Sequence, residues 1–73
     1  DSIISNHVQI APGVVMGGGV TIGESSIIGL GSRVNQGINI GKNCIIGSGT
    51  IVTKDVPDNT IYYNKQITLK KKC

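Results

Sequence analysis

The fold is decided by residues 20–55, which read VTIGESSIIGLGSRVNQGINIGKNCIIGSGTIVTKD. Within this stretch a large aliphatic residue recurs at every sixth position, at Ile22, Ile28, Val34, Ile40, Ile46 and Val52. The same spacing continues toward the N-terminus through Ile4, Ile10 and Met16. A period of six does not fit the 3.6-residue repeat of an α-helix, but it fits a short strand followed by a turn.

Two other positions of the repeat are equally regular. The residue two before each aliphatic is small or β-branched, as at Val20, Ser26 and Cys44. The residue three after each aliphatic is glycine in five of nine repeats, and the full series is His7, Gly13, Gly19, Ser25, Gly31, Gly37, Asn43, Gly49 and Asp55. Glycine adopts a positive φ freely, and His, Asn and Asp tolerate it best among the other residues. We therefore place the turns at these positions.

Three six-residue units make one coil of about 18 residues, which rises by one strand spacing of roughly 4.8 Å. In this register Ile4 stacks on Ile22 and Ile40, and the glycine columns align as well. We predict an all-β fold, a single-stranded parallel β-helix of about three triangular coils. Pro57 lacks the N–H that a further ladder needs, and Asp58-Asn59 is a typical turn. We therefore expect a β-helix over 1–57, followed by a short C-terminal cap and basic tail over 58–73.

The composition excludes several other classes of protein. The chain has 11 Gly and no Phe or Trp, and 13 Ile and 7 Val supply most of its apolar residues. Glycine and β-branched residues are weak helix formers, which argues against a helical bundle. No apolar run is long enough to cross a membrane, so we expect no membrane partner. With 38% hydrophobic and 15% charged residues, the chain is not compositionally disordered.

The charges and cysteines suggest neither a nucleic-acid partner nor a secreted protein. The net charge is +3, but four of the seven basic residues are Lys65, Lys70, Lys71 and Lys72. We interpret them as a solvated tail and expect no nucleic-acid binding. Cys44 and Cys73 do not have the spacing of a disulfide framework or a metal site. The reducing cytoplasm is the expected compartment.

Outward-facing apolar residues predict a partner. The position just before the inward aliphatic is apolar at Val15, Ile27, Ile45 and Ile51, where solvent favours polar residues. Ile27 and Ile45 lie one coil apart on the same face and form an apolar stripe. Such stripes usually mark an interface, and a core this small gains stability from a neighbour. We predict a homo-oligomer.

The repeat resembles that of the hexapeptide-repeat acyltransferases, which fold as left-handed parallel β-helices. The resemblance covers residues 1–59. The segments IAPGV (10–14), GGVTIG (18–23) and VNQGINIG (34–41) are most similar to sialic acid and bacillosamine-type sugar O- or N-acetyltransferases. The segment IGSGTIVTKDVPDN (46–59) is similar to the terminal signature of hexapeptide transferases in general. The resemblance implies a homotrimer that binds acetyl-CoA as co-substrate between adjacent prisms. It also implies acetyl transfer to a hydroxyl or amine of a sugar or nucleotide sugar, in polysaccharide or glycan precursor synthesis.

The resemblance also implies which residues contact acetyl-CoA. The corner segments Gly29-Leu30 and Gly47-Ser48 present their backbone to the cofactor groove, and each glycine alternatively serves only to let the chain turn. Gln9 stands where the family usually has a histidine that contacts the acyl-CoA. The family's closing G-x-P-A-[KR] motif is replaced by Tyr63-Asn64-Lys65-Gln66.

No catalytic residue is assigned within this chain. The family's general base is a histidine that would lie immediately before Asp1, so we expect the chain to be the C-terminal part of a longer enzyme. The only histidine, His7, is expected to be a solvent-exposed turn residue rather than a catalytic base or other ligand. A single histidine also excludes the three-His zinc site of the γ-type carbonic anhydrases that share this fold, and we expect no metal. The alternative function is a non-catalytic β-helix that serves as a structural or trimerisation module.

Overall fold

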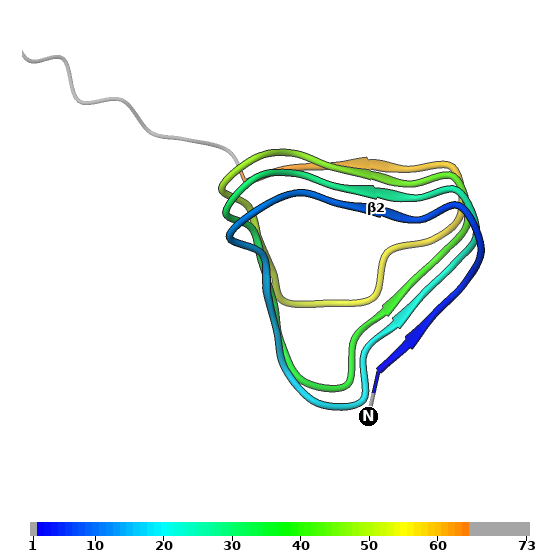
Figure 1. The fold of residues 1–73 in the computed structure, drawn as a ribbon, viewed down its shortest axis with the longest axis horizontal. Coiled ribbons are helices and arrows are strands. Elements are labelled where there is room, and N and C mark those ends of the chain that lie inside the picture. Colours follow the sequence, from blue (N-terminus) through cyan, green and yellow to red (C-terminus); the bar gives the residue numbers. More distant parts are fainter. Residues whose placement is uncertain (1, 65–73) are drawn as a thin grey trace, which may run out of the picture.

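The computed structural model describes residues 2–64, which form three coils of a parallel β-helix and part of a fourth (Figure 1). The cross-section is a triangle, and a two-residue strand lies along each side. The strands are β1 (Ile3–Ile4), β2 (Gln9–Ile10), β3 (Val15–Met16), β4 (Thr21–Ile22), β5 (Ile27–Ile28), β6 (Arg33–Val34), β7 (Asn39–Ile40), β8 (Ile45–Ile46), β9 (Ile51–Val52) and β10 (Ile61–Tyr62). No helix occurs among the described residues, and hence none that could cross a membrane. The predicted fold class is confirmed.

Strands of successive coils stack into three parallel sheets. Sheet A contains β1, β4 and β7; sheet B contains β2, β5, β8 and β10; sheet C contains β3, β6 and β9. Ile4 pairs with Ile22, and Ile22 pairs with Ile40, each 18 residues further along the chain. Sheets B and C keep the same register through their first three strands. The 18-residue coil predicted from the six-residue period is therefore present.

The chain turns at three corners between the sheets. The A/B corner contains residues 6–7, 24–25, 42–43 and 58–59; the B/C corner contains 12–13, 30–31 and 48–49; the C/A corner contains 18–19 and 36–37. The second residue of each turn has a positive φ, and it is glycine throughout the B/C and C/A corners. At the A/B corner it is His7, Ser25, Asn43 or Asn59, with φ between 55° and 62°. Eight of the nine predicted turn positions are correct, and Asp55 is the exception because the fourth coil is shorter.

The core is the inward column of aliphatic residues. Ile22, Ile28, Val34, Ile40, Ile46 and Val52 are each at most 2% exposed. Each of these side chains contributes about 1.5–3 kcal/mol by leaving water. In the first coil Ile4 and Ile10 are 44% and 38% exposed, since no described coil lies below them. The inward aliphatics of the second and third coils therefore form the buried core.

A second inward column lies just before each strand and contains buried polar groups. The Ser26 hydroxyl donates to the carbonyl of Gly41 at 2.7 Å and accepts from the amide of Cys44 at 3.0 Å. The Ser32 hydroxyl likewise donates to the carbonyl of Gly47 at 2.8 Å. Because both hydroxyls are paired, their burial carries no cost of an unmade hydrogen bond. They tie consecutive coils together from the inside.

The coils approach each other so closely that some positions accept only glycine. A Cβ built on Gly23 would lie 2.6 Å from the carbonyl carbon of Gly41. One built on Gly29 would lie 2.6 Å from the amide nitrogen of Ser48. Both glycines directly follow an inward aliphatic, and their amides donate to the next coil at 2.7 and 2.8 Å. At Gly23 and Gly29 the absence of a Cβ therefore allows this close approach of the two coils.

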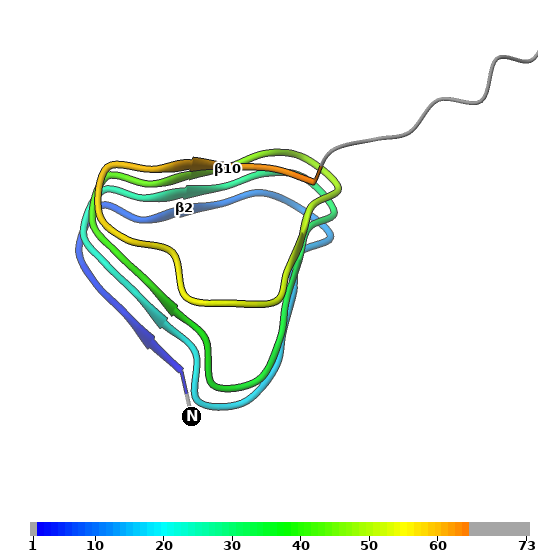
Figure 2. The same ribbon diagram turned by 180° about the vertical axis from the view of Figure 1, so that it is seen from behind.

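The fourth coil is two residues shorter than the others. After β9 the chain cuts across the triangle instead of running out to the C/A corner, as the yellow segment in Figure 1 shows. Val56 then pairs with Ile40, and Ile61 with Ile45, at a spacing of 16 rather than 18 residues. β10 adds a fourth strand to sheet B, beside β8 (Figure 2). The regular repeat thus ends after β9, before Pro57, and the ladder continues beyond it with the 16-residue offset.

Side chains complete the hydrogen bonding at this end of the prism. The Asp55 carboxylate accepts from the amide of Asn39 at 2.9 Å, and the Asp58 carboxylate accepts from the amide of Lys42 at 2.8 Å. The Asn64 side chain accepts from the Ile51 amide at 2.7 Å and donates to the Ile51 carbonyl at 3.2 Å. Its amide thus replaces the peptide group of a further strand. The predicted division at residues 57 and 58 stays a prediction, and residues 65–73 of the expected cap lie outside the described residues.

The close approach of the coils predicts opposite effects for two Gly→Ala substitutions. Gly23→Ala places a methyl group against the Gly41 peptide and should lower the free energy of unfolding by about 1–3 kcal/mol. Gly18 has no atom within 4 Å of the same position and no positive φ. Gly18→Ala should therefore be neutral or stabilising by up to about 1 kcal/mol. Urea unfolding of both variants measures the difference, and an equal loss in both would contradict the stacking.

Candidate cofactor-binding corner

Four of the five residues expected to contact acetyl-CoA lie together at the B/C corner. Gly29 and Leu30 belong to the second coil, and Gly47 and Ser48 lie directly above them in the third. The fifth residue, Gln9, is exposed on the outer face of sheet B, where it pairs with Ile27 in the neighbouring coil. The structure thus places the corner residues in one column and Gln9 on the adjoining face.

The two glycines of this corner do not make the turn themselves. The positive φ values at this corner belong to Gly13, Gly31 and Gly49. Gly29 is instead required by the close approach of Ser48, and Gly47 has the Tyr63 Cβ 3.2 Å from the place of a Cβ. Coil stacking therefore accounts for both glycines without a ligand.

The surface of the corner combines an apolar side chain with backbone donors. Leu30 is 56% exposed, and Ser48 beside it is exposed too. The amides of Leu30 and Ser48 donate to no acceptor within residues 2–64, whereas those of Gly29 and Gly31 are bonded. Free amide donors next to an apolar side chain suit a ligand with both amide carbonyls and methylene groups.

Tyr63 and Asn64 form the fourth level of the corner, which the six-residue period does not predict. Because the fourth coil is two residues short, Tyr63 lies above Gly47, and it is 67% exposed. Asn64, the next residue, is held in place by two hydrogen bonds between its side chain and the backbone of Ile51. The only signal in the sequence was the replacement of the family's closing motif at this place. The 16-residue offset of the fourth coil could not be read from a six-residue period.

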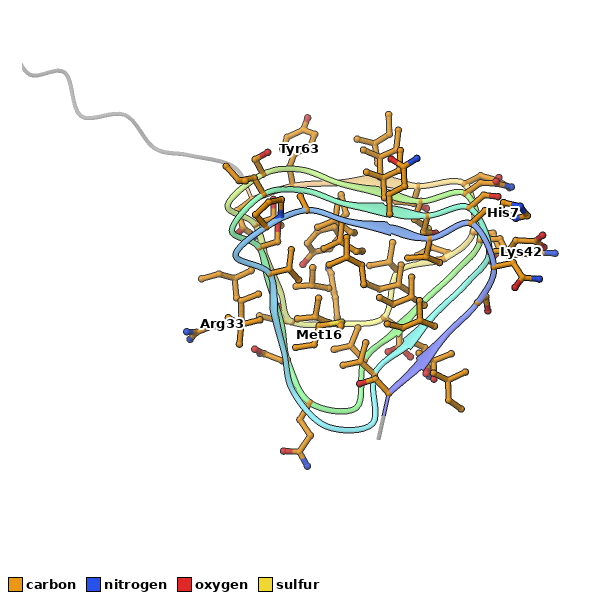
Figure 3. The ribbon with its side chains drawn as sticks, viewed as in Figure 1. His7, Met16, Arg33, Lys42 and Tyr63 are labelled. Carbon is orange, nitrogen blue, oxygen red and sulfur yellow. The ribbon has the colours of Figure 1, made fainter. Side chains whose placement is uncertain are left out.

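His7 lies at a different corner from these residues. It has a φ of 61° in the A/B corner and is exposed. Its Nδ1 is 3.9 Å from Glu24 Oε2, and the two side chains are 77% and 54% exposed. In Figure 3 His7 and Lys42 project on the side of the prism opposite Tyr63 and Arg33. His7 is therefore a turn residue, apart from the candidate cofactor corner.

The described residues form no pocket and no group of ligands for a metal ion. The B/C corner is an outer edge of the triangular prism, and Leu30 and Tyr63 are exposed on it (Figure 1). A ligand that lies along this corner is covered by the prism on one side only, and the other side of the ligand stays uncovered. A buried binding site on this corner therefore needs a second surface.

Comparison with solved structures identifies the class of β-helix. The acetyltransferase domain of PglB from Neisseria gonorrhoeae, solved in complex with acetyl coenzyme A, matches 84% of this chain with 33% identity and a TM-score of 0.83. A mutant of perosamine N-acetyltransferase from Caulobacter crescentus, solved with CoA and GDP-perosamine, matches 84% of the chain with 34% identity and a TM-score of 0.82. Serine acetyltransferase from Entamoeba histolytica shares the fold, with 20% identity over 99% of the chain and a TM-score of 0.61.

The chain is a hexapeptide-repeat β-helix like those of the sugar N-acetyltransferases PglB and perosamine N-acetyltransferase. It spans 30% of the PglB domain structure and 29% of the perosamine N-acetyltransferase structure. The resemblance found in the sequence is therefore confirmed. A comparison with protein-family models and with curated proteins finds no match.

The A/B corner predicts that glycine can replace its left-handed residues. His7→Gly and Ser25→Gly relieve the steric cost of a positive φ, although glycine loses more backbone entropy on folding. Each free energy of unfolding should stay within about 1 kcal/mol of the wild type. Thermal unfolding measures both variants. A larger loss for His7→Gly alone would show that its side chain has a structural role beyond the turn.

Proposed function

We propose that this chain is the β-helical portion of an acetyl-CoA-dependent sugar acetyltransferase. The acceptor group would be a hydroxyl or amine of a sugar or nucleotide sugar, in the synthesis of a polysaccharide or glycan precursor. The observation that supports this best is identity of 33–34% over 84% of the chain to two structures solved with acetyl-CoA or CoA. The uncovered B/C corner gives such a cofactor a surface to follow.

The residues of the chain contribute binding and positioning in this proposal. The amides of Leu30 and Ser48 donate to amide carbonyls of the pantetheine arm, and Leu30 packs against its methylene groups. Gln9, on the adjoining face of sheet B, is the side chain nearest to the role that the family gives to a histidine. In the reaction, the acceptor oxygen or nitrogen attacks the thioester carbonyl carbon, a general base takes the acceptor proton, and the thiolate of CoA leaves. We assign no residue of this chain to the base.

A second copy of the chain would supply the missing wall of the site. Ile27, Ile45 and Ile61 stand one above another on the outer face of sheet B and are 40%, 44% and 66% exposed. The stripe seen in the sequence thus includes a third isoleucine from β10. Burial of this stripe against another prism would remove apolar surface from water and place a second surface beside the B/C corner. We propose a homotrimer with acetyl-CoA between adjacent prisms, and we retain the cytoplasm as its compartment.

The alternative is a non-catalytic β-helix that serves as a structural or trimerisation module. Two observations favour it. Coil stacking explains Gly29 and Gly47 without a cofactor. Moreover, the only histidine of the chain lies at the A/B corner, away from these residues. The two functions differ in one property that is simple to measure, the binding of acetyl-CoA.

Calorimetric titration with acetyl-CoA tests the proposed function. The acetyltransferase proposal predicts saturable binding, with a Kd of about 1 mM or below. Leu30→Asp should weaken it at least tenfold, because a carboxylate at the corner repels the phosphates and removes the apolar contact. Gln36→Asp is the matched control, since Gln36 has the same place in the C/A corner of the same coil. No binding at millimolar acetyl-CoA would support the structural module instead.

The isoleucine stripe predicts where a charge disrupts the assembly. Ile45→Lys places an ammonium group in the stripe and should dissociate the oligomer. Asn39→Lys is the matched control, because Asn39 is the outward residue of sheet A in the same coil. Sedimentation equilibrium measures both variants. An oligomer that survives Ile45→Lys, or dissociates equally with Asn39→Lys, would contradict this interface.

A further inference from the structure

Arg33 is the one charged residue at an outward strand position within residues 2–64. It lies in β6 on sheet C, between Val15 of the coil below and Ile51 of the coil above. These two neighbours are 55% and 48% exposed. The other charged residues of the described part occur at the A/B corner or in the connection after β9, at Glu24, Lys42, Lys54, Asp55 and Asp58.

The guanidinium group of Arg33 has no carboxylate within 4 Å in the described part of the chain and donates no hydrogen bond there. Two aliphatic side chains flank its stem, so neither neighbour supplies a counter-charge. A guanidinium group binds phosphate through two parallel N–H donors, and such charge-assisted hydrogen bonds are stronger than neutral ones. Arg33 is therefore a cation that can bind an anionic ligand on this face.

Tyr63 lies on the other side of the same corner. It directly follows β10, which pairs with β8, and the two hydrogen bonds between Asn64 and Ile51 hold the residue after it. Figure 3 shows Arg33 projecting from sheet C and Tyr63 projecting beyond sheet B, both outward and on either side of the B/C corner. Arg33 is in the second coil and Tyr63 in the fourth, so they differ by about two strand spacings, roughly 10 Å along the axis.

A guanidinium group and an exposed aromatic ring can bind the two parts of a nucleoside phosphate. The first pairs with its phosphates, and the second stacks on its base, a contact worth about 1–3 kcal/mol in single-stranded nucleic acid complexes. The corner between them carries the apolar side chain and free amides that suit the rest of acetyl-CoA. These three features lie on one edge of the prism.

We propose that Arg33 and Tyr63 bind the nucleotide end of acetyl-CoA, with the phosphates at Arg33 and the adenine on Tyr63. This inference rests on the proposed cofactor corner and adds two residues to it. The shared ligand chemistry is a nucleoside phosphate, which a nucleotide-sugar acceptor would also carry. We commit to the cofactor because both side chains flank the column of Gly29, Leu30, Gly47 and Ser48.

Calorimetry with three ligands tests the proposal. Coenzyme A carries the whole nucleotide, acetyl-pantetheine lacks it, and GDP stands for the nucleotide of an acceptor. Arg33→Gln should weaken coenzyme A binding at least tenfold and leave acetyl-pantetheine binding within twofold. Lys54→Gln is the matched control, since it removes the same charge from another exposed position and should change coenzyme A binding less than twofold. Tyr63→Ala should weaken coenzyme A binding about fivefold, and Tyr63→Phe should preserve it.

The outcomes separate this inference from the proposed function. Wild-type chain that binds neither coenzyme A nor acetyl-pantetheine would overturn both. Coenzyme A binding that Arg33→Gln and Lys54→Gln reduce equally would overturn the Arg33 site and leave the proposed function standing. Loss of GDP binding without loss of coenzyme A binding would assign the site to the acceptor and overturn the cofactor assignment. A change of oligomeric state in Arg33→Gln, measured by sedimentation, would give Arg33 a packing role and would overturn the proposal as well.

Discussion

The structure depends on the stacking of one coil on the next at the distance of a single β-ladder. Each coil donates backbone amides to the carbonyls of the coil above it, for example from Gly23 to Ile40 and from Gly29 to Ile46. At this distance a Cβ does not fit directly after the inward aliphatic at Gly17, Gly23, Gly29 or Gly41, where it would lie less than 3.0 Å from the next coil. The same stacking aligns the isoleucines and valines inside the prism, so that the core is a set of columns rather than a cluster. The absence of Phe and Trp agrees with an interior of this width.

The last coil shows how the stacking ends and how its end shapes the candidate site. The chain omits two residues after β9, and Asp55, Asp58 and Asn64 then supply the oxygen and nitrogen atoms that a full coil would have supplied. Edge strands otherwise offer free peptide groups to other chains. The shortened coil also brings Tyr63 over Gly47, at the top of the B/C corner. One local change in the repeat thus closes sheets A and C and adds an aromatic side chain beside the proposed cofactor site.

The sequence predicted the regular part of the structure well, because a six-residue period fixes register, corners and inward columns together. Ile22, Ile40, Gly31 and Gly49 all lie where the period places them. The sequence could not predict the fourth coil, since Val56 and Ile61 pair at a 16-residue offset that the six-residue repeat does not predict. It also did not separate the two kinds of glycine, those at positive φ such as Gly31 and those required by stacking such as Gly29. The sequence did not single out Arg33, because its candidate role depends on residues that are near it only in space, namely Val15, Ile51 and the B/C corner.

Residue-resolved hydrogen exchange by NMR tests the central claim, the coil-to-coil ladder, most directly. The amides of Gly23, Gly29, Gly41 and Gly47 each donate to the next coil at 2.7–2.9 Å. Those of Gly18, Leu30 and Ser48 donate to no acceptor within residues 2–64. Amides in a stacked ladder should exchange more slowly than unbonded ones by a factor on the order of a hundred. The β-helix predicts this difference between the two sets; equal exchange rates in both would contradict it.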